Sequence, residues 1–265
     1  MNIYLELTQA FNAGRLRAIL SSGQAVVLHR LAIMSKDGDW ILREDPEALA
    51  HVLRVLETYG AHYRFGAPLD ARWLAGGWSA HFEFRRAALR VRTDFVTRPA
   101  RLSAQQLQAL WEQNAQAEIP VTDLASLVEI KKTNREKDYA VIGELARRLT
   151  NPREQLLYSR SAQDLLQLAR QQPALVAELA GLRPLLAQLK SERAAVEVAL
   201  DAERRALMHA NERRLAGYFT AAEVWQQHWP TVERSLASLP LTAAHAQLLA
   251  HAEGRLPLQP APEIP

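Results

Sequence analysis

The chain has 265 residues, of which 48% are hydrophobic, so it is long enough for one large domain or two small ones. It contains no cysteine, which excludes disulfides and thiolate metal sites and fits a reducing compartment. With 32 basic and 29 acidic side chains the net charge is only +3, so the overall charge does not call for nucleic acid as a partner.

The N-terminal segment predicts a cytoplasmic protein. It carries Glu6 and lacks both the basic start and the unbroken apolar run of a signal peptide. No stretch approaches the roughly 18 consecutive apolar residues of a membrane span. We therefore expect a cytoplasmic chain that does not interact with a membrane, and we leave its oligomeric state open.

The N-terminal region predicts a helix, a strand and a hairpin. Apolar residues at helical spacing predict a helix over Thr8–Leu20, and the Val-, Leu- and Ile-rich run Gln24–Met34 predicts a strand. The Asp-Gly pair within Lys36–Asp39 favours a hairpin turn, with Trp40–Arg43 as the returning strand. The two aspartates of this turn form an Asp-x-Asp pair of the kind that binds metals, but turn chemistry explains them better.

The next hundred or so residues predict further helices and strands. Asp45 and Pro46 start a helix that is expected to end at Gly60. The other expected elements are extended segments at Ala61–Phe65, Arg72–Leu74 and Ser79–Arg86, a strand through Asp94 that ends before Pro99, a helix opened by Ser103 and a helix capped by Thr122 or Asp123. This alternation predicts an α/β (α+β) domain with a small mixed sheet.

After Thr150–Pro152 the sequence predicts only helices, because strand-like runs vanish and Ala, Leu, Gln, Glu and Arg dominate. From Leu182 onward a set of positions is spaced alternately by four and three residues, as the core positions of a coiled coil would be. Arg193 and Glu203 occupy two of them, which favours a long amphipathic helix in a bundle over a coiled coil. The prolines after Leu256 predict a loose tail. The expected parts are an α/β domain over residues 1–150, a helical domain over 151–255 and a Pro-rich tail over 256–265.

A Gly-Gly turn and the strand behind it form the first candidate site. Gly76 and Gly77 have no side chains to obstruct a phosphate, and Ser79 adds a small hydroxyl group. Arg90 and Asp94 lie on the strand that follows. Gly-Gly turns occur in many loops, so the turn alone is weak evidence. The strand that follows it, with Arg90 and Asp94, is what favours a nucleotide site.

Arginines gather around the Asp94 strand, with Glu83 and Asp94 as the nearby acids. Guanidinium groups match phosphate oxygens in bidentate geometry. The cluster fits a phosphate-rich ligand, either a nucleoside triphosphate or an RNA backbone, and equally a solvated strand edge that opposes self-association. Its members are Arg85, Arg86, Arg90, Arg92, Arg98 and Arg101.

A third segment carries Lys131, Lys132, Arg135, Lys137 and Asp138. In order and spacing the three segments resemble the minimal nucleotidyltransferases, especially the toxin–antitoxin and abortive-infection branch. That family shows a Gly-Gly or Gly-Ser turn, an Arg-x-Thr-x-Asp-x-Asp strand, and a later helix reading Leu-x-x-x-Lys followed by Arg-x-Lys-Asp. Without the resemblance, the third segment is a solvated basic face with Asp138 in local ion pairs.

The resemblance covers about the first 150 residues and implies a nucleoside triphosphate as substrate or ligand. It also implies Mg²⁺ held by Asp94 as the catalytic and metal-binding residue, and it places Lys131 towards the triphosphate. The nucleotide-binding residues that it implies are Gly76, Gly77, Ser79, Arg90, Arg92, Lys131, Arg135 and Asp138.

The family pattern is incomplete at its acidic pair. With Arg90 and Asp94 in their matching positions, Arg92 replaces the threonine and Val96 the second aspartate. Sliding the register leaves Arg92 in place of the first aspartate. Because Mg²⁺ in this family is held between clustered carboxylates, we expect nucleotide binding with weak or absent catalysis. The alternatives are a non-catalytic partner-binding component of a toxin–antitoxin or phage-defence system, or an RNA-binding protein.

Overall fold

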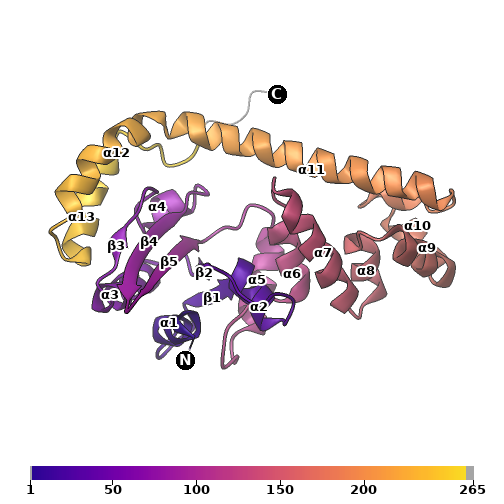
Figure 1. Ribbon diagram of the computed structural model, residues 1–265, viewed down its shortest axis with the longest axis horizontal. Coiled ribbons are helices and arrows are strands. Elements are labelled where there is room, and N and C mark those ends of the chain that lie inside the picture. Colours follow the sequence, from indigo (N-terminus) through magenta and orange to yellow (C-terminus); the bar gives the residue numbers. More distant parts are fainter. Residues whose placement is uncertain (1, 261–265) are drawn as a thin grey trace. The chain divides into compact units, whose positions relative to one another are not determined.

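The computed structural model describes residues 2–260 and shows an α+β protein that is 57% helical and 11% strand. The chain forms two compact units. The sheet unit comprises Met1–Thr122 with Leu215–Pro265, and the helical unit comprises Asp123–Arg214. Figure 1 labels their elements. The predicted boundary near residue 150 does not coincide with this division, because two helices before it pack in the helical unit and the C-terminal helices return to the sheet unit.

The sheet of the sheet unit has the order β1-β2-β5-β4-β3. Strands β2 and β5 are parallel and the other neighbours are antiparallel. The strands are β1 Ala18–Ser21, β2 Asp37–Leu42, β3 His62–Tyr63, β4 Ala80–Arg86 and β5 Leu89–Val96. The predicted Asp94 strand is therefore confirmed, and it lies at the centre of the sheet.

Short-range capping signals set the start of several helices in the sheet unit. The Asp45 carboxylate accepts a hydrogen bond from Ala48 N at 2.8 Å, and Ser103 forms a capping box with Gln106. Both predicted starts are confirmed. The helices of this unit are α1 Ile3–Phe11, α2 Ser22–Leu28, α3 Pro46–Thr58, α4 Ala71–Leu74, α5 Ala104–Gln113, α12 Glu223–Leu236 and α13 Leu241–Ala252.

One face of the sheet carries the hydrophobic core, with α1 and α3 packed against it (Figure 1). Trp40 and Phe95 are paired across β2 and β5, and their rings stack at 5.4 Å. Phe11 of α1 meets the Trp40 ring edge-on at 5.3 Å. The indole N–H of Trp40 donates to Thr8 Oγ1 at 2.9 Å, so this fully buried side chain has its polar atom satisfied.

The C-terminal helices complete this core from the β3 side. Tyr63 of β3 is buried, and its hydroxyl forms a hydrogen bond of 2.7 Å with Nδ1 of His245 on α13. Leu69 N donates to the same hydroxyl oxygen at 3.2 Å. Burial lowers the pKa of His245, because the charged imidazolium is disfavoured in this buried position.

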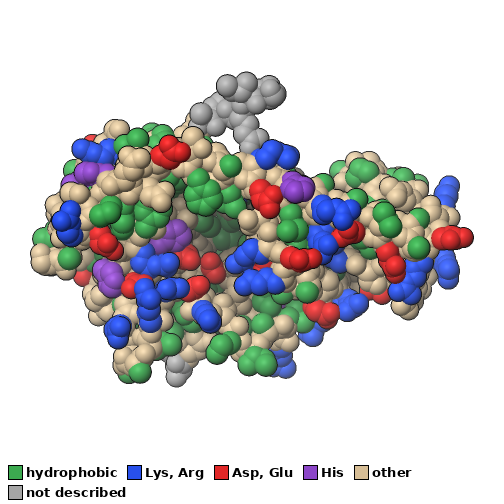
Figure 2. All heavy atoms as spheres, turned by 45° about the horizontal axis from the view of Figure 1, so that its top comes forward, with side chains coloured by type: hydrophobic (Ala, Val, Ile, Leu, Met, Phe, Trp, Pro, Cys, Tyr) green, Lys and Arg blue, Asp and Glu red, His purple; other side chains and the backbone are tan. Residues whose placement is uncertain are grey.

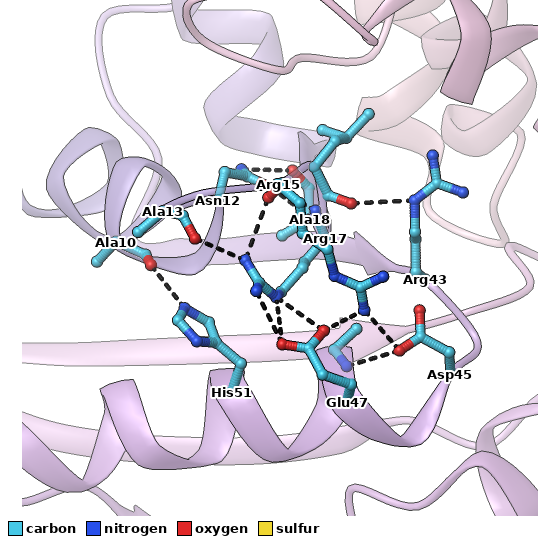
Figure 3. A network of polar contacts seen from close by, with 12 residues as sticks. Ala10, Asn12, Ala13, Arg15, Arg17, Ala18, Arg43, Asp45, Glu47 and His51 are labelled. Atoms are coloured by element: carbon cyan, nitrogen blue, oxygen red, sulfur yellow. Dashed lines mark hydrogen bonds and ion pairs between the residues drawn. The ribbon is translucent and has the colours of Figure 1, made fainter.

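A buried guanidinium joins the α1–β1 connection to α3 (Figure 3). Arg17 is 8% exposed, and its Nε lies 3.1 Å from both carboxylate oxygens of Glu47. Arg17 also donates to Ala13 O at 2.8 Å, and Arg15 forms a second ion pair with Glu47. Hydrogen bonds from Arg17 lower the pKa of Glu47 to about 2, aided by Arg15 against the opposing effect of desolvation.

The helical unit has no strand among its residues 123–214. Its elements are α6 Leu124–Lys131, α7 Glu136–Arg148, α8 Pro152–Tyr158, α9 Ala162–Gln171, α10 Pro173–Leu179, a 3₁₀ turn at Pro184–Gln188, and most of α11 Arg193–Ala221. The predicted helical character after residue 150 is confirmed. The long helix expected from Leu182 begins only at Arg193, because the 3₁₀ turn at Pro184–Gln188 precedes it. No helix among residues 2–260 is long and apolar enough to cross a bilayer.

A buried ion cluster explains the acidic residue in the apolar seam of α11. Glu203 accepts hydrogen bonds from Arg183 Nε at 2.9 Å and Nη2 at 2.8 Å, and it also pairs with Arg160. Arg183 donates in addition to the carbonyl oxygens of Leu156 and Ser159. Burial alone would raise the pKa of Glu203, but Arg183 and Arg160 hold it below its ordinary value. The charge is thus retained inside because it is fully paired.

Two N-terminal predictions are wrong. The expected helix over Thr8–Leu20 is displaced: α1 ends at Phe11, and Asn12 accepts hydrogen bonds from the backbone of Arg17 and Ala18, which closes the turn into β1. The expected strand Gln24–Met34 is the helix α2 over its first part. Its Val-rich sequence is helical because α2 packs against β1 and β2, and such packing overrides β-propensity.

The predicted hairpin turn at Lys36–Asp39 is also wrong, since Asp37 already lies on β2. Gly38 is required by packing rather than by a turn. A Cβ atom there would lie 2.5 Å from the rings of Tyr4 and Trp40. The two aspartates therefore lie on β2, a strand paired with β5, and their side chains are on one face of the sheet.

The predicted loose tail is only partly described, since residues 261–265 lie outside the described part of the chain. Leu256 is buried, and its carbonyl accepts a hydrogen bond from Trp73 Nε1 at 3.0 Å. Trp78 Nε1 donates to Pro257 O at 2.9 Å. The tail therefore begins as a docked segment, because two indole N–H groups find their acceptors on it.

Candidate functional site

The face of the sheet opposite the core carries a row of polar side chains. Residues paired directly across neighbouring strands point to the same face. Asp39 of β2 is paired with Asp94 of β5, and Asp94 is paired with His81 of β4. On the other side, Ser21 at the end of β1 is paired with Asp39. Four strands thus bring one serine, two aspartates and one histidine into a single line.

A hydrogen-bonded chain runs along this row from Asp94. His81 Nδ1 lies 2.7 Å from Asp94 Oδ1, and His81 Nε2 lies 2.8 Å from Ser79 Oγ. Nη1 of Arg64 lies 3.4 Å from the same Asp94 oxygen. The histidine and the aspartate are each 26% exposed, so the chain is partly shielded from water yet open to a ligand.

A second polar row lies two residues further back on the same face. Asp37 is paired with Arg92, and Arg92 is paired with Glu83. The Oδ1 atom of Asp37 is buried and makes no hydrogen bond, and the same is true of Arg92 Nε, which lies 3.9 Å from Glu83 Oε2. A buried carboxylate oxygen without a donor is rare, so a cation or donor from outside the chain is the natural partner for Asp37.

The three aspartates act together on Tyr4, which donates its hydroxyl to Lys36 O at 2.6 Å. Burial raises the pKa of the Tyr4 hydroxyl, and the negative charges of Asp37, Asp39 and Asp94 raise it further. The three aspartates thus all lie near enough to Tyr4 for their charges to act on its hydroxyl. Such a concentration of negative charge favours a cation.

Glu83 neutralises much of the predicted arginine cluster. Its Oε2 accepts hydrogen bonds from Arg90 Nε at 2.9 Å and from Nη2 at 2.6 Å, and Arg64 Nε lies 3.7 Å away. Burial would raise the pKa of Glu83, but Arg90, His62 and Arg64 hold it below its ordinary value. Arg98 pairs with Glu44 and Arg86 with Glu6. Figure 2 likewise shows basic and acidic side chains interspersed on the face that it presents.

The Gly-Gly turn is covered by the protein itself. Tyr218 donates its hydroxyl to Gly76 O at 2.9 Å, and a Cβ atom on Gly77 would collide with that hydroxyl. A Cβ atom on Gly76 would collide with Leu258 O. The glycines therefore admit a tyrosine and the C-terminal segment, which accounts for them without a phosphate. Of this motif, only Ser79 contacts the polar row, through its hydrogen bond with His81.

The third predicted segment belongs to the helical unit. Lys131 is 6% exposed, and its Nζ lies 3.8 Å from Asp138 Oδ1. The other Asp138 oxygen accepts from Thr133 Oγ1 at 2.6 Å and from Arg135 Nε at 2.8 Å. These residues join the end of α6 to the start of α7, so their contacts have a structural role within that unit.

The sequence interpretation weighed Asp37 and Asp39 as a metal-binding pair but assigned both to a turn, and it did not identify His81 as a site residue. The signal for Asp37 and Asp39 was their Asp-x-Asp spacing, which also suits alternate positions on one strand face. The role of His81 depends on pairing between β4 and β5, which no local pattern encodes. Among residues 2–260, no three histidine, aspartate or glutamate side chains form a ready-made metal cluster. Comparison with models of known protein families, with curated proteins and with solved structures finds no match.

Proposed function

We propose that the protein is a nucleotidyltransferase that binds a nucleoside triphosphate and a divalent cation on the polar face of its sheet. The observation that carries this proposal is the pairing of Asp39 with Asp94 across the parallel strands β2 and β5, with Asp37 on the same face. Clustered carboxylates on neighbouring strands supply the oxygen ligands that Mg²⁺ prefers. Strand β5 lacks a second carboxylate beside Asp94, and Asp39 on β2 would supply it.

The resemblance to minimal nucleotidyltransferases fits β2 better than β5. The family strand Arg-x-Thr-x-Asp-x-Asp matches Asp37 and Asp39 at both acidic positions, and Ser35 offers a hydroxyl at the threonine position. Ile33 replaces the arginine. A Ser-Gly pair at Ser22-Gly23, directly after β1, supplies the residue types of the family turn. This placement keeps the acidic pair intact.

The residues present fit a divalent cation at Asp37 and Asp39. Asp37 Oδ1 is buried without a hydrogen-bond partner, whereas Asp94 Oδ1 is engaged by His81 and lies near Arg64. A bound Mg²⁺ would neutralise charge on the transferred phosphate, and two carboxylates suffice when waters and substrate oxygens complete its shell. We therefore assign the metal to Asp37 and Asp39.

The remaining polar residues of this face bind and position the substrate. Arg92 has its Nε without a hydrogen-bond partner beside Asp37, so its guanidinium suits a phosphate oxygen. Asp94 orients His81 through the hydrogen bond to Nδ1. The proposed site thus has two parts. Strand β2 and Arg92 bind the phosphates and the metal, and β4 and β5 carry the residues that contact a hydroxyl group.

The test measures nucleotide binding by thermal denaturation. The protein is heated with each nucleoside triphosphate, in the presence and in the absence of Mn²⁺. A ligand at 100 times its Kd stabilises the native state by about 2.7 kcal/mol. We expect metal-dependent stabilisation in the wild type, and we expect Asp37→Asn and Asp39→Asn to remove it.

The matched control is Glu118→Gln, which removes one charge from an exposed position outside the polar rows. This variant should respond to nucleotide as the wild type does. Equal stabilisation with and without metal, or unchanged stabilisation in the two aspartate variants, would overturn the proposed metal site.

A further inference from the structure

We propose that Ser79 is an activated nucleophile and that the protein transfers a nucleotidyl group to this serine. The inference rests on the proposed function for the donor, a nucleoside triphosphate. The assignment of Ser79 as the acceptor rests on the geometry of β4 and β5. Ser79 Oγ, the His81 imidazole and the Asp94 carboxylate form a continuous chain with links of 2.8 Å and 2.7 Å.

The direction of the protons along this chain follows from the groups themselves. A carboxylate can only accept, so His81 donates its Nδ1 proton to Asp94. The Nε2 atom of the neutral ring then carries a lone pair, and Ser79 Oγ–H donates to it. This is the arrangement in which an imidazole removes the proton from an attacking serine, while the aspartate holds the ring in the required tautomer.

The backbone around the chain is held in place. Ala67 N donates to Ser79 O at 3.0 Å, and Arg64 N donates to His81 O at 2.9 Å. Gly66 leaves the space that the imidazole occupies, since a Cβ atom there would lie 2.5 Å from His81 Cδ2. The serine directly before β4, the histidine on β4 and the aspartate on β5 thus show the nucleophile–base and base–orienter hydrogen bonds that nucleophilic catalysis needs.

The position of Asp94 connects this chain to the proposed nucleotide site, because Asp94 is paired with Asp39 on the same face. In the reaction, Ser79 Oγ forms a bond to the α-phosphorus while its proton passes to His81 Nε2. The bond from that phosphorus to the oxygen bridging to the β-phosphate breaks, and pyrophosphate leaves with the electron pair. The product is a phosphodiester between Ser79 and a nucleoside monophosphate.

The experiment incubates the full-length protein with each nucleoside triphosphate and Mn²⁺ and maps the modified residue by peptide mass spectrometry. We expect one nucleoside monophosphate on Ser79, and none at that position in Ser79→Ala. His81→Asn should lower the labelling rate about 10²-fold or more, the range for loss of a general base. Nucleotide affinity is measured in parallel, and the labelling of each variant is compared at saturating nucleotide so that lost binding is separated from lost nucleophilic attack. Ser103→Ala, which alters a helix cap remote from the chain in sequence, is the control and should label normally.

The outcomes separate this inference from the proposed function. Pyrophosphate release or labelling elsewhere at the wild-type rate in Ser79→Ala would overturn the inference while the proposed function stands. If the wild type binds no nucleotide, the proposed function fails, and a fluorophosphonate probe tests the serine alone. Attack on that probe forms a Ser79–phosphorus bond and releases fluoride. Labelling of Ser79 that is lost in His81→Asn supports the activated nucleophile, and absence of labelling overturns it.

Discussion

Carboxylates of the sheet unit differ in their partners, and the partner determines what each can do. Glu47 is saturated by Arg17 and Arg15, and Glu83 by arginines that the sequence suggested for phosphate. These two acids are fixed in place and have little capacity left for a ligand. Asp37 has a buried oxygen without a hydrogen bond, so it retains that capacity.

The Glu47 ion pair should make the protein sensitive to strong acid. A carboxyl pKa that is lowered by folding stabilises the native state above the unfolded pKa, and this contribution is lost as the pH falls through the folded pKa. For Glu47 that window runs from the ordinary value of 4.5 down to about 2. We expect Glu47→Gln to lower the thermal midpoint most above this window and progressively less within it.

Thermal denaturation of wild type and Glu47→Gln across this pH range is the measurement, with Glu118→Gln as an exposed control. A difference between wild type and Glu47→Gln that stays constant from neutral pH to pH 2 would show that the lowered pKa has no consequence for stability.

At the scale of elements, β2 depends on a glycine whose neighbours are aromatic. Gly38→Ala places a methyl group 2.5 Å from the rings of Trp40 and Tyr4. Overpacking of this kind costs about 1–3 kcal/mol. Because Asp37 and Asp39 flank this position, the substitution should also weaken metal-dependent nucleotide binding.

Gly217→Ala is the matched control, since Gly217 lies within α11 and no heavy atom is within 4 Å of the added Cβ. It should stabilise the protein by about 0.5–1 kcal/mol because alanine favours the helix. Denaturant titration measures both changes. Equal effects of the two substitutions would contradict the packing role of Gly38.

The sequence allowed prediction of elements wherever local chemistry decides them. Asp45 and Ser103 cap helices as expected, and the Asp94 strand lies where the sequence predicts it and ends before Pro99. The helix α2 could not be predicted, because its Val-rich residues are helical only through contacts with β1 and β2. The glycine motif misled for a similar reason: Tyr218, far away in sequence, occupies the space beside it.

The site itself was predictable only in part. Ser79 and Asp94 were identified from local motifs; Asp94 belongs to the polar row, and Ser79 contacts that row through His81. Their link through His81 requires the register between β4 and β5, and the neighbour Asp39 requires the parallel pairing of β2 with β5. Long-range strand pairing is thus the information that single motifs lack.

At the scale of the whole molecule, the sheet unit needs both ends of the chain. Trp225, Val232 and Leu248 from the C-terminal helices are buried in the same core as Trp40 and Phe95. A chain ending at Arg214 leaves that core uncovered, so we expect it to bind a hydrophobic dye and to lose cooperative unfolding. Normal cooperative unfolding of this shortened chain would contradict the shared core.

Point substitutions at two adjacent positions of α12 test, in the full chain, whether the stability of the sheet unit depends on the C-terminal helices. Trp225 is 1% exposed and Val224 is 58% exposed. Trp225→Ala should cost about 3–5 kcal/mol, as for other buried tryptophans, while Val224→Ala should change stability by less than about 0.5 kcal/mol. Chemical denaturation compares them directly.

The insertion of residues 123–214 into the sheet unit affects the order in which the protein is made. On the ribosome all five strands and the helices α1 and α3 emerge before the helical unit, yet residues that complete their core, such as Leu248 and Leu256, emerge almost last. At about 5–20 residues per second, the interval from Val96 to Leu248 lasts roughly 8–30 seconds. By the end of this interval the helical unit is complete, while the part of the apolar core that the C-terminal helices cover is still open, so we expect the nascent chain to bind chaperones that hold exposed hydrophobic surface.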